Sequence, residues 1–326
     1  MTALKEAGQA FDEEEELPSY LSSVRRLWMR VRHPSPMVRR FLTNPLSMAG
    51  MILVFLFAVI AILAPYLAPP TRPDEPYRIP RDGFAAEPQP PSAEHPFGTT
   101  EGQYDVYYGT IWGTRTAFRV GLIITGATVF IGLAVGTIAG FYGGLLDEGL
   151  MRIVEIFMAF PFLLAALTMS VVLQPIMGRS LVTGMIALIT FSWTTYARLI
   201  RGDILTVKER DFVLAAKVTG AGDLRLMLRH VIPNAIFPTL VVASMDIGTY
   251  VIVFSALSFL GVGEEMGYAD WGQMISFARN WMSQLHLYWW ILLFPGGAIL
   301  FFCLAWNLIG DAFRDVLDPR LRQIRK

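Results

Sequence analysis

The sequence predicts an all-α membrane protein that crosses the bilayer six times, with both ends of the chain in the cytoplasm. Hydrophobic residues make up 54% of the 326 positions and charged residues only 17%, and the mean hydropathy is +0.46. Soluble domains carry more charge than this. Long windows without Asp, Glu, Lys or Arg recur along the chain. Each can hold a helix of about 20 residues, the length that spans the hydrocarbon core.

The spans follow from these windows. We expect them near 46–67, 118–141, 153–174, 181–200, 235–262 and 287–310. The five windows without a charged residue are 41–71, 120–146, 156–178, 180–197 and 280–310, and a sixth, 230–263, is interrupted only by Asp246. Pro161 lies inside the third span, where its missing N–H predicts a kink.

Lysine and arginine positions set the orientation, because cytoplasmic loops carry an excess of both. Residues 19–44 hold six arginines and no acid, and residues 198–229 hold seven basic residues against four acidic ones. Residues 68–119 instead hold seven acids against five bases. This distribution places both termini and the 198–229 loop in the cytoplasm. An apolar stripe from Leu21 to Val31 predicts a helix that lies at the membrane interface.

Four regions result from these assignments. Residues 1–44 form a cytoplasmic tail with the interfacial helix, and residues 45–116 hold the first span and a long, proline-rich external loop. Residues 117–312 form a five-helix core, and residues 313–326 form a cytoplasmic C-terminal tail. The external loop is too long for an idle connection.

The cytoplasmic segment 211–234 is the strongest candidate for a contact with another protein. Val213 to Val218 predicts a short helix, and Gly220 stands two residues later, where a left-handed residue commonly ends a helix. A helix–glycine–helix elbow exposed at a membrane face suits docking into a groove on a partner. The alternative is an ordinary cytoplasmic loop helix.

The second helix of this elbow is expected to begin after Asp223, whose side chain would cap it. Its apolar stripe consists of Leu224, Leu228 and Val231, and Pro233 is expected to end it.

Asp246 is the one acid near the middle of a predicted span, where a charged carboxylate costs roughly 3 kcal/mol on insertion scales. It could line the translocation pathway and contact a cationic part of a solute. The sequence favours a structural alternative, in which Asp246 is protonated or hydrogen-bonded at a helix interface. Its expected helpers are then Ser244, Thr249 and Tyr250.

Segment 211–234 resembles the "EAA" loop of ATP-binding-cassette (ABC) import permeases, in which Glu-Ala-Ala is followed by Gly and then by His near Pro. Five residues match that pattern, and Leu214 stands in place of the glutamate; the matches are Ala215, Ala216, Gly220, His230 and Pro233. The stretch His95–Thr99 with Asp105, and the stretch Asn307–Leu321, resemble the same family. The resemblance runs from about Pro45 to Leu321. It is typical of the C-type permease subunit of dipeptide and oligopeptide importers, whose relatives carry nickel, glutathione or oligosaccharides.

The resemblance implies a type I ABC importer permease fold in the cell (inner) membrane of a bacterium or archaeon. The ATPase subunits are then expected to dock at Leu214, Ala215, Ala216, Gly220, Asp223, Arg229, His230 and Pro233. The implied partners, besides the lipid bilayer, are a second permease subunit, two ABC ATPase subunits and an extracytoplasmic substrate-binding protein. The implied solute is a dipeptide or oligopeptide, or a related solute such as nickel or an oligosaccharide. No cofactor is expected in this chain.

Other classes of function are disfavoured. The sequence has no Gly-x-x-x-x-Gly-Lys-Ser/Thr loop for ATP, no His-Glu-x-x-His pair and no Gly-x-Ser-x-Gly turn, so we expect no catalytic residue. His95 and Asp105 lack further ligands for a metal. The formal net charge of zero argues against nucleic acid. The remaining alternative is an ion-coupled secondary transporter with Asp246 in the coupling site, although the internal repeat usual for such proteins is not evident.

Overall fold

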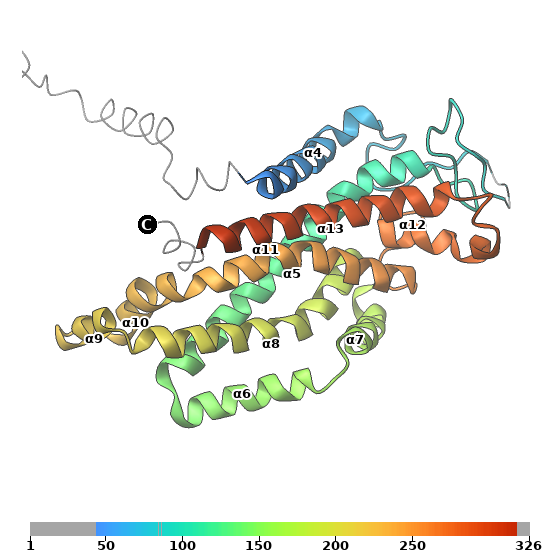
Figure 1. The fold of residues 1–326 in the computed structure, drawn as a ribbon. Helices are drawn as coiled ribbons and strands as arrows, with labels where there is room; N and C mark the ends of the chain where they lie inside the picture. Colours follow the sequence, from blue (N-terminus) through green and yellow to red (C-terminus); the bar gives the residue numbers. More distant parts are fainter. Residues whose placement is uncertain (1–43, 84, 86, 318–326) are drawn as a thin grey trace, which may run out of the picture. The chain divides into compact units, whose positions relative to one another are not determined.

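The computed structural model describes residues 44–83, 85 and 87–317, and this part of the chain is mostly helical (Figure 1). The long helices are α4 (Pro45–Leu67), α5 (Val106–Tyr142), α6 (Gly144–Met158), α7 (Phe162–Met177), α8 (Leu181–Lys208), α11 (Ile232–Phe259) and α13 (Trp290–Leu317). The short elements are α9 (Asp211–Val218), α10 (Asp223–Leu226), a π turn (Met227–Val231), α12 (Trp271–Phe277) and a 3-10 turn (Arg279–Gln284). The expected interfacial helix at 21–31 lies outside the described residues. The all-α prediction is confirmed for the described part.

Within that part, four helical runs are long and apolar enough to cross a membrane, and the pair α6 and α7 makes a fifth if it counts as one span. The four are Pro45–Leu67, Val106–Tyr142, Asp223–Phe259 and Trp290–Asp315. Helix α8 covers the expected span 181–200 but continues through Arg201 to Lys208. The total of six spans and the cytoplasmic location of both ends therefore stay predictions.

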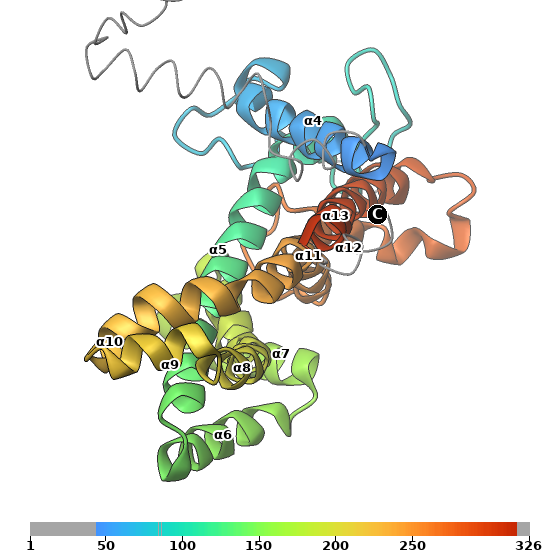
Figure 2. The same ribbon diagram turned by 60° about the vertical axis from the view of Figure 1, so that its left-hand side comes forward.

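The kink expected at Pro161 is confirmed, and it is a full break, because α6 and α7 meet at 86°. Figure 2 shows them as separate rods joined at a corner. Pro161 occupies the N-cap position of α7. It has no N–H to continue the hydrogen bonding of α6, and its ring disfavours a helical backbone at Phe160. The corner lies against α8, where the rings of Phe157 and Phe191 are 5.7 Å apart.

Helix α5 begins at Val106, twelve residues before the expected start of its span. The charges of Arg115 and Arg119 had shortened the apolar window used for the prediction. In the structure, the guanidinium carbon of Arg119 lies 4.8 Å from the centre of the Tyr77 ring, which belongs to the loop before α5. At about 1.5 Å per residue, the 37 residues measure roughly 55 Å, well beyond a hydrocarbon core of about 30 Å. The N-terminal end of α5 therefore extends beyond the span and carries the loop that precedes it.

Helices α5 and α8 pack with their backbones close together because three glycines of α5 face α8. A Cβ atom at Gly132 would collide with Tyr196, one at Gly136 with the carbonyl oxygen of Ala197, and one at Gly140 would lie 3.0 Å from the carbonyl oxygen of Arg201. Small residues at this spacing permit such an approach. As a result Tyr196 is fully buried.

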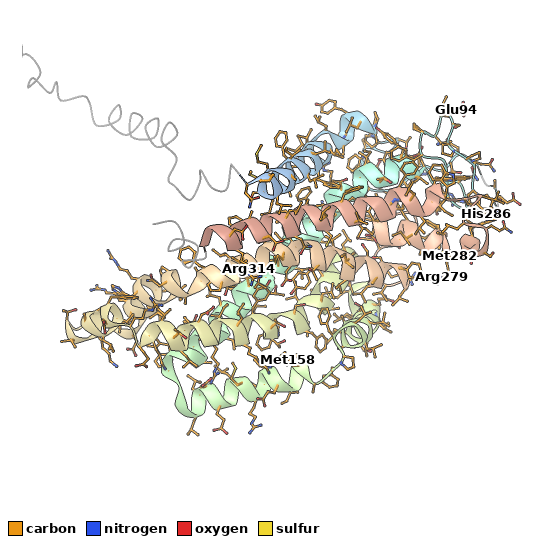
Figure 3. All side chains as sticks on the ribbon, in the orientation of Figure 1. Glu94, Met158, Arg279, Met282, His286 and Arg314 are labelled. Carbon is orange, nitrogen blue, oxygen red and sulfur yellow. The ribbon has the colours of Figure 1, made fainter. Side chains whose placement is uncertain are left out.

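The external loop is tied down at the end of the helices opposite to the elbow, where Figure 3 labels Glu94 and His286. Three indole N–H groups make these ties. Trp112 donates to the carbonyl oxygen of Ala68 at 2.9 Å, and Trp290 donates to that of Thr99 at 3.1 Å. Trp281 donates to the carboxylate of Glu101 at 2.9 Å. The loop is thus held in place by hydrogen bonds and covers this end of the helix bundle.

The expected helix end at Pro233 is wrong. Helix α10, the π turn and α11 form one run from Asp223 to Phe259, and Pro233 lies at the start of α11. The π turn ends at Val231, two residues before this proline, and widens the helix there. The extra residue accommodates a ring and a missing N–H that a regular helix would not. The elbow and the central span are therefore one continuous rod (Figure 1).

Candidate functional site

The turn of the elbow is a complete Schellman motif centred on Gly220. The N–H of Gly220 donates to the carbonyl oxygen of Lys217 at 3.0 Å, and the N–H of Ala221 donates to that of Ala216 at 3.1 Å. Gly220 has φ +86°, a left-handed conformation that residues with a Cβ atom adopt at a cost. The predicted role of Gly220 as the residue that ends α9 is confirmed.

The cap of the second elbow helix differs from the prediction. Gly222, with φ −71° and ψ 158°, is the N-cap of α10, and Asp223 is the first helical residue, without a side-chain cap hydrogen bond. The Schellman turn leads straight into the extended backbone of Gly222, whose carbonyl oxygen accepts from Leu226 at 2.9 Å. Asp223 therefore acts only through its charge at the positive end of the helix dipole.

The elbow is anchored to α8 by a different apolar face from the one expected. Val213, Leu226 and Val231 join Ile204 and Val207 of α8 in one buried cluster. The stripe prediction was wrong for two of its members, since Leu224 is 66% exposed and Leu228 is 60% exposed. The extra residue in the π turn rotates the preceding helix, so that Leu226 faces α8 in their place.

The residues expected to dock a partner lie on one accessible elbow. Most are exposed: Leu214, Ala215, Gly220, Asp223, Arg229 and Pro233. Ala216 is half-buried against the anchoring cluster, and His230 is half-buried within the π turn. Further exposed apolar side chains surround them, chief among them Val218 at 88%. The elbow thus presents apolar side chains mixed with cations, while a separate face fixes it to α8.

A second site is a cavity of about 290 Å³ beside α11. Its walls come from the corner between α6 and α7, where Figure 3 labels Met158, and from α8 and α11. Five aromatic residues contribute to it: Phe157, Phe160, Phe162, Phe191 and Tyr250. Asp246 also lines it, fourteen residues after the start of α11 and thirteen before its end.

The partner of Asp246 comes from another helix. The hydroxyl of Tyr196 donates to Asp246 Oδ2 at 2.6 Å, from a residue 50 positions away. The expected helpers do otherwise: Ser244 donates to the carbonyl oxygen of Val241 and Thr249 to that of Met245. These short-range bonds satisfy the hydroxyls within their own helix, so the expectation was wrong for Ser244 and Thr249.

A protein-family model described as "Binding-protein-dependent transport system inner membrane component" matches residues 132–323. A second model, described as "N-terminal TM domain of oligopeptide transport permease C", matches residues 35–91. The first covers more than half of the chain and includes both the elbow and the cavity. The chain belongs to this family of importer permeases.

Relatives of the permease carry consistent names. The permease is 35% identical to "Dipeptide transport system permease protein DppC" of Alkalihalophilus pseudofirmus, over 86% of this chain and 87% of the relative. It is also 35% identical to "Oligopeptide transport system permease protein OppC" of Bacillus subtilis, over 87% and 88%. An inward-facing structure of the MetNI methionine ABC transporter has the same fold, with a TM-score of 0.53 and 17% identity over 65% of the permease and 97% of that chain.

Family membership confirms several predictions. The permease is an inner-membrane subunit of an ABC importer, and in this family ATP is hydrolysed in separate subunits. Membership supports ATP-driven transport and gives no support to the ion-coupled alternative. It also implies that the permease works within a complex.

At the end of the helices opposite to the elbow, His95 links three segments that the sequence connected only in part. Its Nδ1 lies 2.7 Å from Asp105 Oδ2, and its Nε2 lies 3.1 Å from Asp82 Oδ2. Asp105 Oδ1 also accepts from the N–H of Tyr108 at 2.8 Å and so caps α5. Within the described residues no group of three or more His, Cys, Asp and Glu is suited to a metal. The motif therefore ties the external loop to the start of α5.

Proposed function

We propose that this permease translocates dipeptides or oligopeptides across the cell membrane, paired with a second permease subunit. Two ABC ATPase subunits would drive it, and an extracytoplasmic binding protein would deliver the solute. The names of the relatives that match most of its length support this solute class. The chain itself carries no cofactor in this scheme, because ATP binds to the ATPase subunits.

The observation that carries the proposal is the continuity of the elbow with α11. A rod from Asp223 to Phe259 joins the proposed docking surface to the helix that lines the membrane cavity. The buried cluster with α8 makes the other connection. Closure of the ATPase subunits around ATP would move the elbow and, with it, α8 and α11. Such a rigid link is what coupling between two sites requires.

The surface of the elbow fits a protein partner. Val218, Leu224 and Leu228 are the most exposed of the apolar side chains on this segment. Lys217, Arg225 and Arg229 are exposed nearby. An apolar centre with basic residues around it suits a groove with an acidic rim, and burial of the exposed leucines would supply much of the affinity.

The test is purification of the tagged full-length chain from its native membrane in mild detergent. The eluate should contain an ATPase and a second permease in fixed ratio. After reconstitution into vesicles with ATP inside and the binding protein outside, labelled dialanine or pentaalanine should accumulate. A non-hydrolysable ATP analogue should abolish accumulation. Absence of an ATPase from the eluate, or accumulation driven by an ion gradient alone, would contradict the proposal.

A further inference from the structure

The cavity beside α11 holds a carboxylate near the middle of that helix, with no cation among the described residues to balance it. Asp246 lies almost midway along α11. No lysine, arginine or histidine is among the residues that line the cavity, and Asp246 forms no ion pair with any described residue. A charge at membrane depth is costly, so such a group normally has a partner.

The two oxygens of Asp246 have different surroundings. Oδ2 accepts the hydroxyl of Tyr196, a fully buried residue of α8 that packs against Gly132 of α5. Oδ1 accepts no hydrogen bond from a described side chain, and it is not among the fully enclosed polar atoms that lack a partner. One oxygen is thus held in place and the other is left accessible at the cavity.

The walls of the cavity complement a cation. Phe157, Phe160, Phe162 and Phe191 surround the space with aromatic rings, and Thr195 and Thr249 add hydroxyls. Aromatic faces attract an ammonium group, and more strongly where water is scarce. A carboxylate with one free oxygen supplies a charge-assisted hydrogen bond to the same group. Neither feature favours an anion.

We propose that Asp246 is the counter-charge for the protonated amino group of the solute as the solute passes the middle of the membrane. Tyr196 is the positioning residue that orients the carboxylate. The inference rests on the proposed function, because a peptide carries such an amino group at its N-terminus. It adds a specificity-determining residue to that function. Solutes with a free amine are stabilised inside the pathway by the Asp246 carboxylate, which the Tyr196 hydroxyl already orients before the solute arrives.

The experiment compares four forms of the reconstituted full complex: the wild type, Asp246→Asn, Asp246→Glu and Tyr196→Phe. Uptake of labelled dialanine or pentaalanine is measured against the concentration of loaded binding protein. Asn keeps the shape of Asp and can still accept the Tyr196 hydroxyl, so Asp246→Asn removes the charge alone. Its maximal uptake rate should fall at least tenfold. The binding-protein concentration for half-maximal uptake should not change, because docking occurs elsewhere.

The other variants separate charge from structure. Asp246→Glu should recover at least a third of the wild-type rate, and Tyr196→Phe should lose less than threefold. Wild-type uptake by Asp246→Asn would overturn the proposal. So would equal losses in Asp246→Asn and Tyr196→Phe with matching falls in the melting temperature of the complex, because the pair would then only join α8 to α11. Loss of the second permease from the Asp246→Asn complex would also overturn the proposal, because Asp246 would then pair with a cation of that subunit and not with the solute. If the wild type takes up neither peptide, the proposed function itself fails.

Discussion

Arg201 of α8 holds Asp147 of α6 with both ends of its guanidinium fork. Arg201 Nε lies 2.5 Å from Asp147 Oδ1, and Nη2 lies 2.6 Å from Oδ2. The rest of α6 is poorly anchored, with Val154 as its one buried residue. This pair therefore fixes the helix that forms one wall of the membrane cavity.

Asp147→Asn should loosen α6. Hydrogen bonds to charged groups contribute about 1.5–3 kcal/mol, and both side chains here are mostly buried, at 32% and 14% exposure. We expect the free energy of unfolding in detergent to fall by roughly 2 kcal/mol. A control exists on the same helix, where Arg152 and Glu155 pair at 3.3 Å with side chains 72% and 53% exposed. Glu155→Gln should cost below about 0.5 kcal/mol, and equal effects of the two variants would refute the assignment.

Gly220→Val should impair coupling through the backbone alone. No atom lies within 4 Å of a Cβ built at Gly220, so only its φ of +86° resists the change. A residue with a Cβ atom pays about 1–2 kcal/mol there, and we expect ATP-dependent uptake to fall about tenfold. Gly222→Ala is the matched control, since Gly222 has φ −71° and the same open surroundings. Gly220→Asn should lie between them. Similar uptake by all three variants would mean that the shape of the elbow is unimportant.

Leu224→Asp combined with Leu228→Asp should release the ATPase subunits and leave the permease folded. Both side chains are largely exposed, so the charge is solvated until a partner covers it. Recovery of the ATPase with the tagged chain should drop at least tenfold, while the size-exclusion profile of the permease stays unchanged. Leu226→Asp is the contrast, because Leu226 is 1% exposed and its replacement should destabilise the permease itself. Normal ATPase recovery with the double variant would move the docking surface elsewhere.

Asp270→Asn should change how stability depends on pH. Asp270 caps α12 and accepts the N–H of Gln273 at 3.1 Å. Burial raises the pKa of its carboxyl, and hydrogen bonds from Ser258, Gln273 and Gly272 only partly offset this. The folded protein thus binds the proton more tightly than the unfolded chain, so stability falls as pH rises from about 3.9 through the raised pKa. Asparagine caps as well without the charge. The melting temperature of Asp270→Asn relative to wild type should therefore improve between pH 4 and pH 8, and a constant difference would contradict the shift.

The elbow illustrates what could be predicted and what could not. Gly220 was predictable because the conformation at a helix end depends on the residue that occupies it and on its immediate neighbours. The same local rules wrongly predicted a cap at Asp223 and a helix end at Pro233. A π turn next to the proline kept the helix continuous, and packing of Leu226 against α8 selected its register. Such a turn has no signature in the one-dimensional pattern.

Apolar windows without charge were enough to determine that this chain is a helical membrane protein, because the cost of burying charge in hydrocarbon acts on composition and length alone. The family pattern in 211–234 identified the importer permease. Only the tertiary structure decided that Tyr196 faces Asp246, that the break expected at Pro161 bends α6 from α7 by 86°, and that α10 continues into α11. The first of these depends on which helix surfaces meet, because close backbone approach at the glycines of α5 places α8 and its Tyr196. Such contacts join residues far apart along the chain, which no local rule reaches.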